Sequence, residues 1–408
     1  MKSLKRISSV SILFILILAF SAANSVHAVG VVDKITVGDV PVGIACLSGR
    51  GEIFVANSFT NSLSVISDNN NTVTQSGYVQ RGSGVLADPQ NLVYDAAKDE
   101  LFVTGSSSIV SSIPPLNPDA VWVIARDNPV TTATSSAIAP VVVIPIGGSV
   151  VDLAYDSAKG EIWVTNFDGP ISVISDTNNT VIATITVKGY SGSIAYDSAK
   201  GEMFVSDYGA NMVSVISDNT NTVVATIPVE GAAGALAYDG EKGEVFVSNY
   251  TDVVSVISDT NNKVIATVPV EGYLSSLAYD SAKGEIFIEN SVSAPNSTAQ
   301  KVGYVSVISD SSNAVIGKIT VGANLVEMAY DSANNEVYVT NFDNTNISSP
   351  GTVYVISDSS DLSASASPTV PEFSNTLILV LTAVLIETFC VIAWAVKKST
   401  RTIPNSEQ

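Results

Sequence analysis

Between residues 29 and 358 the chain alternates short apolar runs with polar turns, and helical spacing is absent. The runs at 192–196, 202–206, 212–217 and 223–229 are rich in Val and Ile and are separated by turn-forming residues such as Asp-Ser-Ala-Lys-Gly. This pattern predicts short β-strands. Several runs are apolar on both faces, as expected when each small sheet is covered by a neighbour on both sides.

The four-run unit recurs seven times. Its marker is Gly-Glu-apolar-aromatic-Val, and the central copies are spaced by 41, 42 and 41 residues. Such a period is too long for leucine-rich repeats and matches one four-stranded propeller blade. The marker glutamates are Glu52, Glu100, Glu161, Glu202, Glu244, Glu285 and Glu336, counting the variant copy Asp99-Glu100-Leu101-Phe102-Val103. The sequence therefore predicts an all-β, seven-bladed β-propeller over residues 29–358.

The ends of the repeat array predict how the ring closes. The last unit stops after its third strand, at 353–357, so one strand of the seventh blade is missing there. The segment 32–38 (Val-Asp-Lys-Ile-Thr-Val-Gly) matches 316–322, which ends the sixth unit. We therefore expect the N-terminal strand to complete the seventh blade, which also removes an open sheet edge.

The N-terminus has the pattern of an export signal. Residues 2–6 are basic, 7–23 are mostly apolar, and Val26-His27-Ala28 offers small residues for signal peptidase. We predict a signal peptide over 1–28, cut after Ala28, with an uncleaved anchor as the alternative.

The C-terminus has the pattern of a membrane anchor. Residues 376–396 form an apolar stretch long enough to cross a bilayer as a helix. Basic residues follow in the tail 397–408, which predicts a cytoplasmic C-terminus and a propeller outside the membrane. The Ser-rich composition of segment 359–375 predicts a flexible stalk. We expect a cell-surface protein that this single helix anchors to the membrane.

Charge argues against one class of partner. The chain has 39 acidic and 19 basic residues, a formal net charge of −20. An acidic surface repels phosphate backbones, so we expect no nucleic-acid partner.

Catalytic groups are few. His27 is the only histidine and lies in the predicted signal peptide, which removes Ser-His-Asp and Cys-His catalysis from the mature chain. Cys390 lies in the predicted membrane span, so an extracytoplasmic disulfide is not available. Cys46 occupies a position that is tyrosine in the other units, and we interpret it as a packed thiol.

Turn sequences leave calcium open as a cofactor. Asp176-Thr177-Asn178-Asn179 and Asp259-Thr260-Asn261-Asn262 cluster oxygen donors of the kind calcium prefers. Asp and Asn are also ordinary turn residues, so the primary expectation is no cofactor.

The strand ends Trp163-Val164-Thr165-Asn166, Phe246-Val247-Ser248-Asn249 and Tyr338-Val339-Thr340-Asn341, followed by Val-Ile-Ser-Asp, carry a family resemblance. Over roughly residues 31–358 the chain resembles YVTN-type β-propeller repeat proteins of the archaeal cell surface, which are surface-layer-like. Pro371-Glu372-Phe373 before the apolar span resembles a PEF-type sorting signal, which implies removal of the helix by a sortase-like enzyme.

Insertions point to a binding surface. The loops 82–90, 106–119, 293–302 and 343–351 are elongated and fall on one face of neighbouring blades. Long loops on a rigid scaffold commonly carry binding sites, although tolerated insertions are the alternative. The candidate ligand-binding residues of this loop arc are Asp88, Ile109, Leu116, Asp119, Asn296, Asp343 and Asn346.

Export makes N-glycosylation of Asn-x-Ser/Thr sequences plausible. The candidates are Asn70, Asn178, Asn249, Asn296 and Asn346.

Two function hypotheses follow. The first is a non-enzymatic binding, adhesion or envelope protein, with other cell-surface proteins or glycans as partners. The alternative is a propeller enzyme of lactonase or lyase type, with a divalent cation in the central channel. That enzyme would need several Asp, Glu or Asn side chains converging from the innermost strands, whose regular Tyr-Asp ends look structural.

Overall fold

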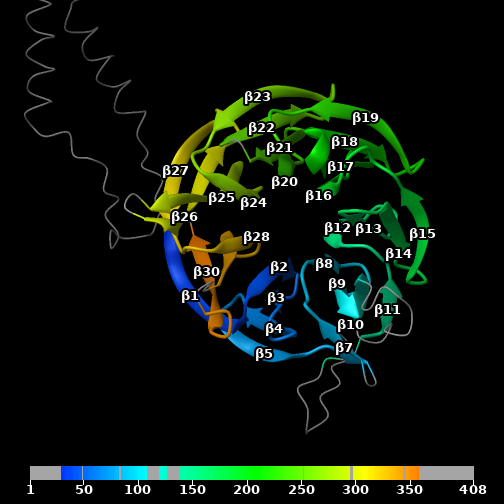
Figure 1. The fold of residues 1–408 in the computed structure, drawn as a ribbon, viewed down its shortest axis with the longest axis vertical. Coiled ribbons are helices and arrows are strands. Elements are labelled where there is room, and N and C mark those ends of the chain that lie inside the picture. The colour runs from blue at the N-terminus through cyan, green and yellow to red at the C-terminus, as the bar shows by residue number, and fades with distance from the viewer. Residues whose placement is uncertain are drawn as a thin grey trace, which may run out of the picture. The chain divides into compact units, whose positions relative to one another are not determined.

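A computed structural model shows seven antiparallel sheets arranged as blades around a common centre (Figure 1), which confirms the predicted all-β, seven-bladed propeller. The structure describes residues 29–47, 49–81, 84–107, 119–125, 138, 140–250, 252–294, 297–342 and 346–357.

The first three blades follow the chain order from the centre outward. Blade 1 contains β2 (Pro41–Leu47), β3 (Glu52–Asn57), β4 (Ser62–Ser67) and β5 (Thr72–Tyr78). Blade 2 contains β8 (Leu92–Asp95), β9 (Glu100–Ser107), β10 (Asp119–Ala125) and β11 (Val142–Pro145), with two extra short strands, β6 (Gln80–Arg81) and β7 (Gly84–Ala87). Blade 3 contains β12 (Val150–Asp156), β13 (Glu161–Asn166), β14 (Ile171–Ser175) and β15 (Thr180–Ile185).

The remaining blades repeat the same order. Blade 4 contains β16 (Ser191–Asp197), β17 (Glu202–Asp207), β18 (Met212–Ser217) and β19 (Thr222–Pro228), with the short 3-10 helix η2 (Tyr208–Ala210) after β17. Blade 5 contains β20 (Ala233–Asp239), β21 (Glu244–Asn249), β22 (Val253–Ser258) and β23 (Lys263–Pro269). Blade 6 contains β24 (Tyr273–Asp280), β25 (Glu285–Ala294), β26 (Ser297–Ser309) and β27 (Ala314–Thr320).

Blade 7 joins the two ends of the propeller. It contains β28 (Leu325–Asp331), β29 (Glu336–Asn341), β30 (Pro350–Ser357) and, on the outside, β1 (Gly30–Asp39). β1 pairs antiparallel with β30, with Ile35 opposite Val353. The predicted closure by the N-terminal strand is thus confirmed.

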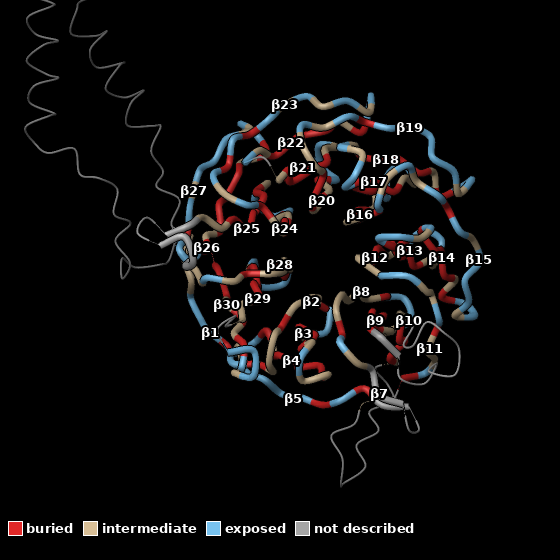
Figure 2. Tube along the Cα trace, in the orientation of Figure 1, coloured by how far each residue is buried: buried red, intermediate tan, exposed pale blue. Residues whose placement is uncertain are grey.

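The core lies between the blades rather than within them. The aromatic residue of each repeat marker is at most 1% exposed. Clusters of buried side chains join consecutive blades; one, for example, packs Phe204 of blade 4 with Val245 and Val247 of blade 5. Figure 2 shows the buried middle strands and the exposed outer strands. The seven aromatic residues are Phe54, Phe102, Trp163, Phe204, Phe246, Phe287 and Tyr338.

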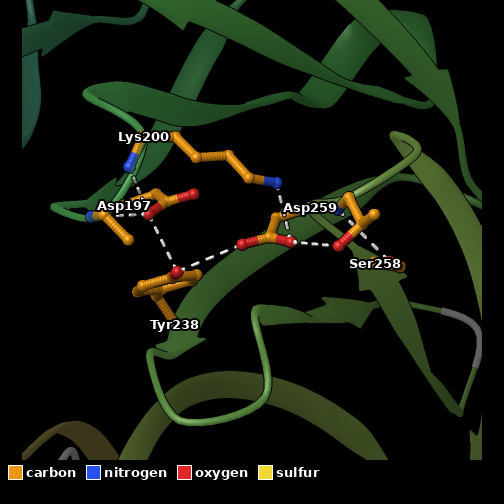
Figure 3. A network of polar contacts seen from close by, with 7 residues as sticks. Asp197, Lys200, Tyr238, Ser258 and Asp259 are labelled. Carbon is orange, nitrogen blue, oxygen red and sulfur yellow. Dashed lines mark hydrogen bonds and ion pairs between the residues drawn. The ribbon is translucent and has the colours of Figure 1, made fainter.

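A polar clasp ties neighbouring blades on the face that carries the turns between first and second strands (Figure 3). Lys200 of blade 4 pairs with Asp259 of blade 5 at 2.8 Å. The Tyr238 hydroxyl lies 2.8 Å from Asp197 and 3.2 Å from Asp259. Equivalent ion pairs are Lys98–Asp176, Lys159–Asp218 and Lys242–Asp310. The repeated Tyr-Asp strand ends are therefore structural, as their regularity predicts.

The clasp also explains the glycine of the repeat marker. Gly201 has a φ of +66°, a left-handed conformation that disfavours other residues. A Cβ atom at Gly201 would lie 2.7 Å from the Asp218 carboxylate. Glycine is thus required both for the turn and for the close approach of the carboxylate.

The predicted terminal segments lie outside the described residues: the signal peptide 1–28, the stalk 359–375, the membrane helix 376–396 and the tail 397–408. In the part of the chain that the structure describes, no helix has the length and apolar character to span a membrane.

Closure by β1 can be tested with Ile35→Ala. Ile35 is 5% exposed and packs in the cluster that joins blades 7 and 1. We expect the free energy of unfolding to fall by about 2–4 kcal/mol in urea denaturation, because a large buried side chain is lost. Val32→Ala on the same strand is the control, since Val32 is 39% exposed; its effect should stay within about 0.5 kcal/mol. Equal effects would contradict an anchoring role for the buried face of β1.

The clasp predicts a pH-dependent contribution to stability. Burial alone would raise the pKa of Asp259, but the hydrogen bond and charge of Lys200 leave it below its ordinary value of 3.8. Lys200→Met removes the charge and should lower the free energy of unfolding at pH 7 by about 1–2 kcal/mol. The Lys200 side chain is 35% exposed, which keeps the effect below that of a fully buried pair.

Because the folded-state pKa of Asp259 is depressed, this contribution is present above its ordinary pKa and lost as the pH falls through the lower folded-state value. Urea denaturation of wild type and Lys200→Met should therefore give a smaller difference at about pH 3 than at pH 7. Ser198→Ala, in the exposed part of the same turn, serves as the control. If wild type and Lys200→Met differ in the free energy of unfolding by the same amount at both pH values, the ion pair is not the source of that difference.

Candidate functional site

One position recurs at the same register in each blade, four residues before the last residue of the first strand. Around the ring these residues are Gly43, Asn91, Asp152, Ser193, Ala235, Ser276 and Glu327. Six of the seven, all but Gly43, line a single pocket. The repeat is highly regular elsewhere, so the variety at this position is notable: two carboxylates, one amide, two hydroxyls and two small residues.

Hydrogen bonds hold the two channel carboxylates in place. Asp152 accepts from the Ser193 hydroxyl at 2.9 Å and from the backbone N–H of Ile194 at 3.2 Å. Glu327 accepts from the Ser276 hydroxyl at 3.0 Å. Each serine hydroxyl in turn accepts a backbone N–H from the next blade, that of Leu236 for Ser193 and that of Met328 for Ser276. The carboxylates are therefore oriented by their neighbours around the ring.

Burial changes the acidity of these groups. Loss of solvent raises the pKa of Asp152 to about 6, against the opposing effect of its hydrogen bonds. Loss of solvent also raises the pKa of Glu327 to about 8, and the nearby charges of Asp152 and Glu289 add to the shift. Asp152 and Glu327 line the same pocket, and Glu289 acts on Glu327 from the second strand of blade 6.

Glu289 is the third acid and breaks the pattern of the second strands. In blades 2, 3, 5 and 7 the equivalent residue is Ser or Thr, whose hydroxyl accepts the backbone N–H of the ring residue. Glu289 is 3% exposed, and its Oε2 atom has no hydrogen-bond partner. Burial raises its pKa to about 7.

A row of aromatic side chains borders the pocket on the face opposite the clasp. Phe167 and Tyr190 stack with ring centroids 4.6 Å apart. Tyr250 lies between Tyr208, at 5.5 Å, and Tyr273, at 4.8 Å. All but Tyr250 are about half exposed. These residues come from connections between second and third strands or from the start of the next blade, and therefore share one face.

The pocket between this row and the ring has a volume of about 500 Å³. Its aromatic lining residues are Phe167, Tyr208, Tyr250 and Tyr273. The hydroxyl groups of Ser193, Ser206, Ser275 and Ser276 add hydrogen-bonding groups. This size and mixture of apolar walls with a few convergent polar groups are typical of small-molecule sites.

Two predicted site residues come together in a separate, smaller pocket. Asp88 and Asp119 line a cavity of about 200 Å³ with Gln90 and Thr104. Asp88 accepts from the Gln90 side chain at 2.7 Å, and Asp119 accepts the backbone N–H of Val150 at 3.0 Å. Burial raises the pKa of Asp119, and the charges of Asp88 and Asp168 contribute. Both carboxylates hold neighbouring segments in place through these hydrogen bonds.

The rest of the predicted loop arc is only partly described. Ile109, Leu116, Asn296 and Asp343 lie outside the described residues. Asn346 is exposed and caps a turn through Ser348. The insertion of unit six, expected as a loop at 293–302, extends the hairpin instead, since Val292 of β25 pairs with Val302 of β26.

The glycosylation candidates differ in accessibility. Asn70, Asn178 and Asn346 are exposed. Asn249 is fully buried, and its side-chain amide donates to Ser255 at 2.7 Å, so the folded propeller has no room for a glycan there. Asn296 lies outside the described residues.

The turns considered for calcium use their aspartates in the clasp, where Asp176 pairs with Lys98 and Asp259 with Lys200. Within the described residues, no three His, Cys, Asp or Glu side chains gather in a way that could hold a metal ion. Cys46 is a free thiol in β2 whose pKa is raised by burial and by nearby Asp331 and Asp68.

The comparisons with known proteins concern the fold. No family model and no curated protein matches the chain. Among solved structures, the chain is similar to the WD40 β-propeller domain of Doa1, at 12% sequence identity over 82% of this chain and 98% of that one, with a TM-score of 0.61. The chain therefore has a WD40-like β-propeller fold.

Proposed function

We propose that this protein is a cell-surface β-propeller that works by binding, as an adhesion, envelope or surface-layer-like protein. Its ligand site is the pocket of about 500 Å³ lined by Asp152, Glu327 and the aromatic row, here called the channel-mouth pocket. The observation that carries the proposal is the convergence of the varied ring residues and the aromatic row on one pocket of about 500 Å³. A scaffold alone has no need for partly buried carboxylates at its centre, because withdrawing an acid from water is unfavourable even when hydrogen bonds compensate part of the cost.

Export and anchoring belong to the same proposal. They rest on the signal-like segment 1–28, the apolar segment 376–396 and the basic tail 397–408. The YVTN-type strand ends and the PEF-type tripeptide support a surface-layer-like setting of archaeal type. Surface proteins or glycans are the proposed macromolecular partners.

The enzyme alternative has less support. A lactonase or lyase of this type needs several Asp, Glu or Asn side chains that converge on a cation. Asn91, Asp152 and Glu327 line one pocket, but in the described part of the chain no three His, Cys, Asp or Glu side chains gather in a way that could hold a metal ion. The channel acids are instead hydrogen-bonded to serines and backbone N–H groups.

Filling the pocket tests the proposal. Ala235→Trp places a bulky side chain on the ring, and Ser198→Trp places the same residue on the exposed turn of the opposite face. The full-length chain and both variants are screened by thermal unfolding against soluble sugars, amines and carboxylates. A ligand at about a hundredfold excess over its Kd should stabilise wild type and Ser198→Trp by about 2.7 kcal/mol, and Ala235→Trp hardly at all.

Two results would contradict the proposal. One is equal stabilisation of all three chains, which would locate binding elsewhere. The other is turnover of a lactone or polysaccharide that requires a divalent cation and is abolished by chelation.

A further inference from the structure

The charge of the channel-mouth pocket is one-sided. Asp152 and Glu327 are among its lining residues, whereas Lys and Arg are absent from the lining that the structure describes. Most acids of the clasp have lysine partners. No ion pair links a base to Asp152 or Glu327 within the described part of the chain. Their charge is therefore balanced by hydrogen bonds alone.

Glu289 strengthens this imbalance. It lies near Glu327 and adjoins Ser275, which lines the pocket. Its Oε2 atom is buried and lacks a hydrogen-bond partner. A second-strand hydroxyl would satisfy the fold at this position, as Thr165 and Thr340 do in other blades. Glu289 keeps a hydrogen bond with Ser275 and lies within reach of the Lys301 charge, but burial of its unpartnered Oε2 atom is costly for folding.

The aromatic row adds the second feature. The faces of Tyr and Phe rings attract cations through their quadrupole. Tyr273 already has the Lys301 ammonium 5.8 Å from its ring centroid, which shows that this row accepts a positive charge. Tyr250 and Tyr208 continue the row along the pocket wall, where an aliphatic chain can lie against them.

We propose that this pocket binds an aliphatic primary amine, with its ammonium group between Asp152 and Glu327 and its carbon chain along Tyr208, Tyr250 and Tyr273. The inference rests on the proposed function and names the ligand class of the same site. A primary ammonium supplies three N–H donors to carboxylate acceptors. Charge-assisted hydrogen bonds of this kind are stronger than those of a neutral hydroxyl.

The acidity of the channel makes the binding pH-dependent. Carboxyl groups with raised pKa values are protonated in acid and become negatively charged as the pH rises. The charges that act on Glu327 are those of Asp152 of β12 and Glu289 of β25, and the charge of Lys301 of β26 acts on Glu289. We expect amine affinity to rise between about pH 6 and pH 8, with release of protons on binding at pH 7.

The experiment is isothermal titration calorimetry of the full-length chain in detergent with cadaverine, its uncharged analogue pentanediol, and glucose. Cadaverine should bind, and pentanediol and glucose should not. Titration at pH 7 in two buffers of different ionisation enthalpy measures the proton release.

Matched variants locate the site. Glu327→Gln keeps the acceptor for Ser276 and removes the charge, and Asp152→Asn provides a second, independent loss of charge. Each should weaken cadaverine binding by about ten- to a hundredfold. Glu271→Gln is the control, since this carboxylate is 76% exposed and lies outside the pocket. Melting curves confirm that each variant is folded.

The outcomes separate the two proposals. Binding of glucose or pentanediol but not cadaverine, abolished by Ala235→Trp, would overturn the amine inference and leave the pocket as a ligand site. Cadaverine binding that survives both charge substitutions would also overturn it. If no probe binds and the ligand screen shows no difference between Ala235→Trp and wild type, both proposals fail.

Discussion

The fold depends on burial of apolar surface between the blades. A single four-stranded blade would expose large side chains on both faces, and the marker aromatic of each blade reaches burial only when that blade lies against the next. The ring must therefore close. β1 makes closure possible, because its Ile35 and Val37 enter the same cluster as Ile53 of blade 1 and Tyr338 of blade 7.

Polar contacts also join neighbouring blades on one face of the propeller. The lysine of one blade reaches the aspartate of the next, and Tyr238 bridges carboxylates of two blades. The clasp uses the same residue types at the boundaries between blades 2 and 6, where Tyr-Asp strand ends recur, and Gly160, Gly201 and Gly243 of blades 3 to 5 occupy the marker position. On the opposite face, the ring positions and strand ends vary from blade to blade.

That variation is where sequence reasoning about the site fell short. Loop length directed attention to Asp88 and Asp119, which share a small pocket, whereas the larger pocket adjoins the short-loop blades. Aligning the first strands would have shown a signal, because Asp152 and Glu327 stand where the other blades have small, hydroxyl or amide residues. Likewise Glu289 stands at a second-strand position that is Ser or Thr in five of the other six blades and Ala56 in blade 1. Residues that differ from their counterparts in the other repeats, more than inserted loops, indicate the residues that line the channel.

The sequence by itself determined the blade number, the four-strand unit and closure by the N-terminal strand, because repeat period and strand patterning are local properties of the chain. Strand predictions such as 202–206 lie within a residue or two of the observed β17. Only the tertiary structure decided which side chains meet. Asp152 and Glu327 are far apart in sequence, yet closing the ring brings their strands to one channel of low dielectric, where burial raises both pKa values. The aromatic row is likewise assembled from separate blades, and no local pattern specifies that its rings stack.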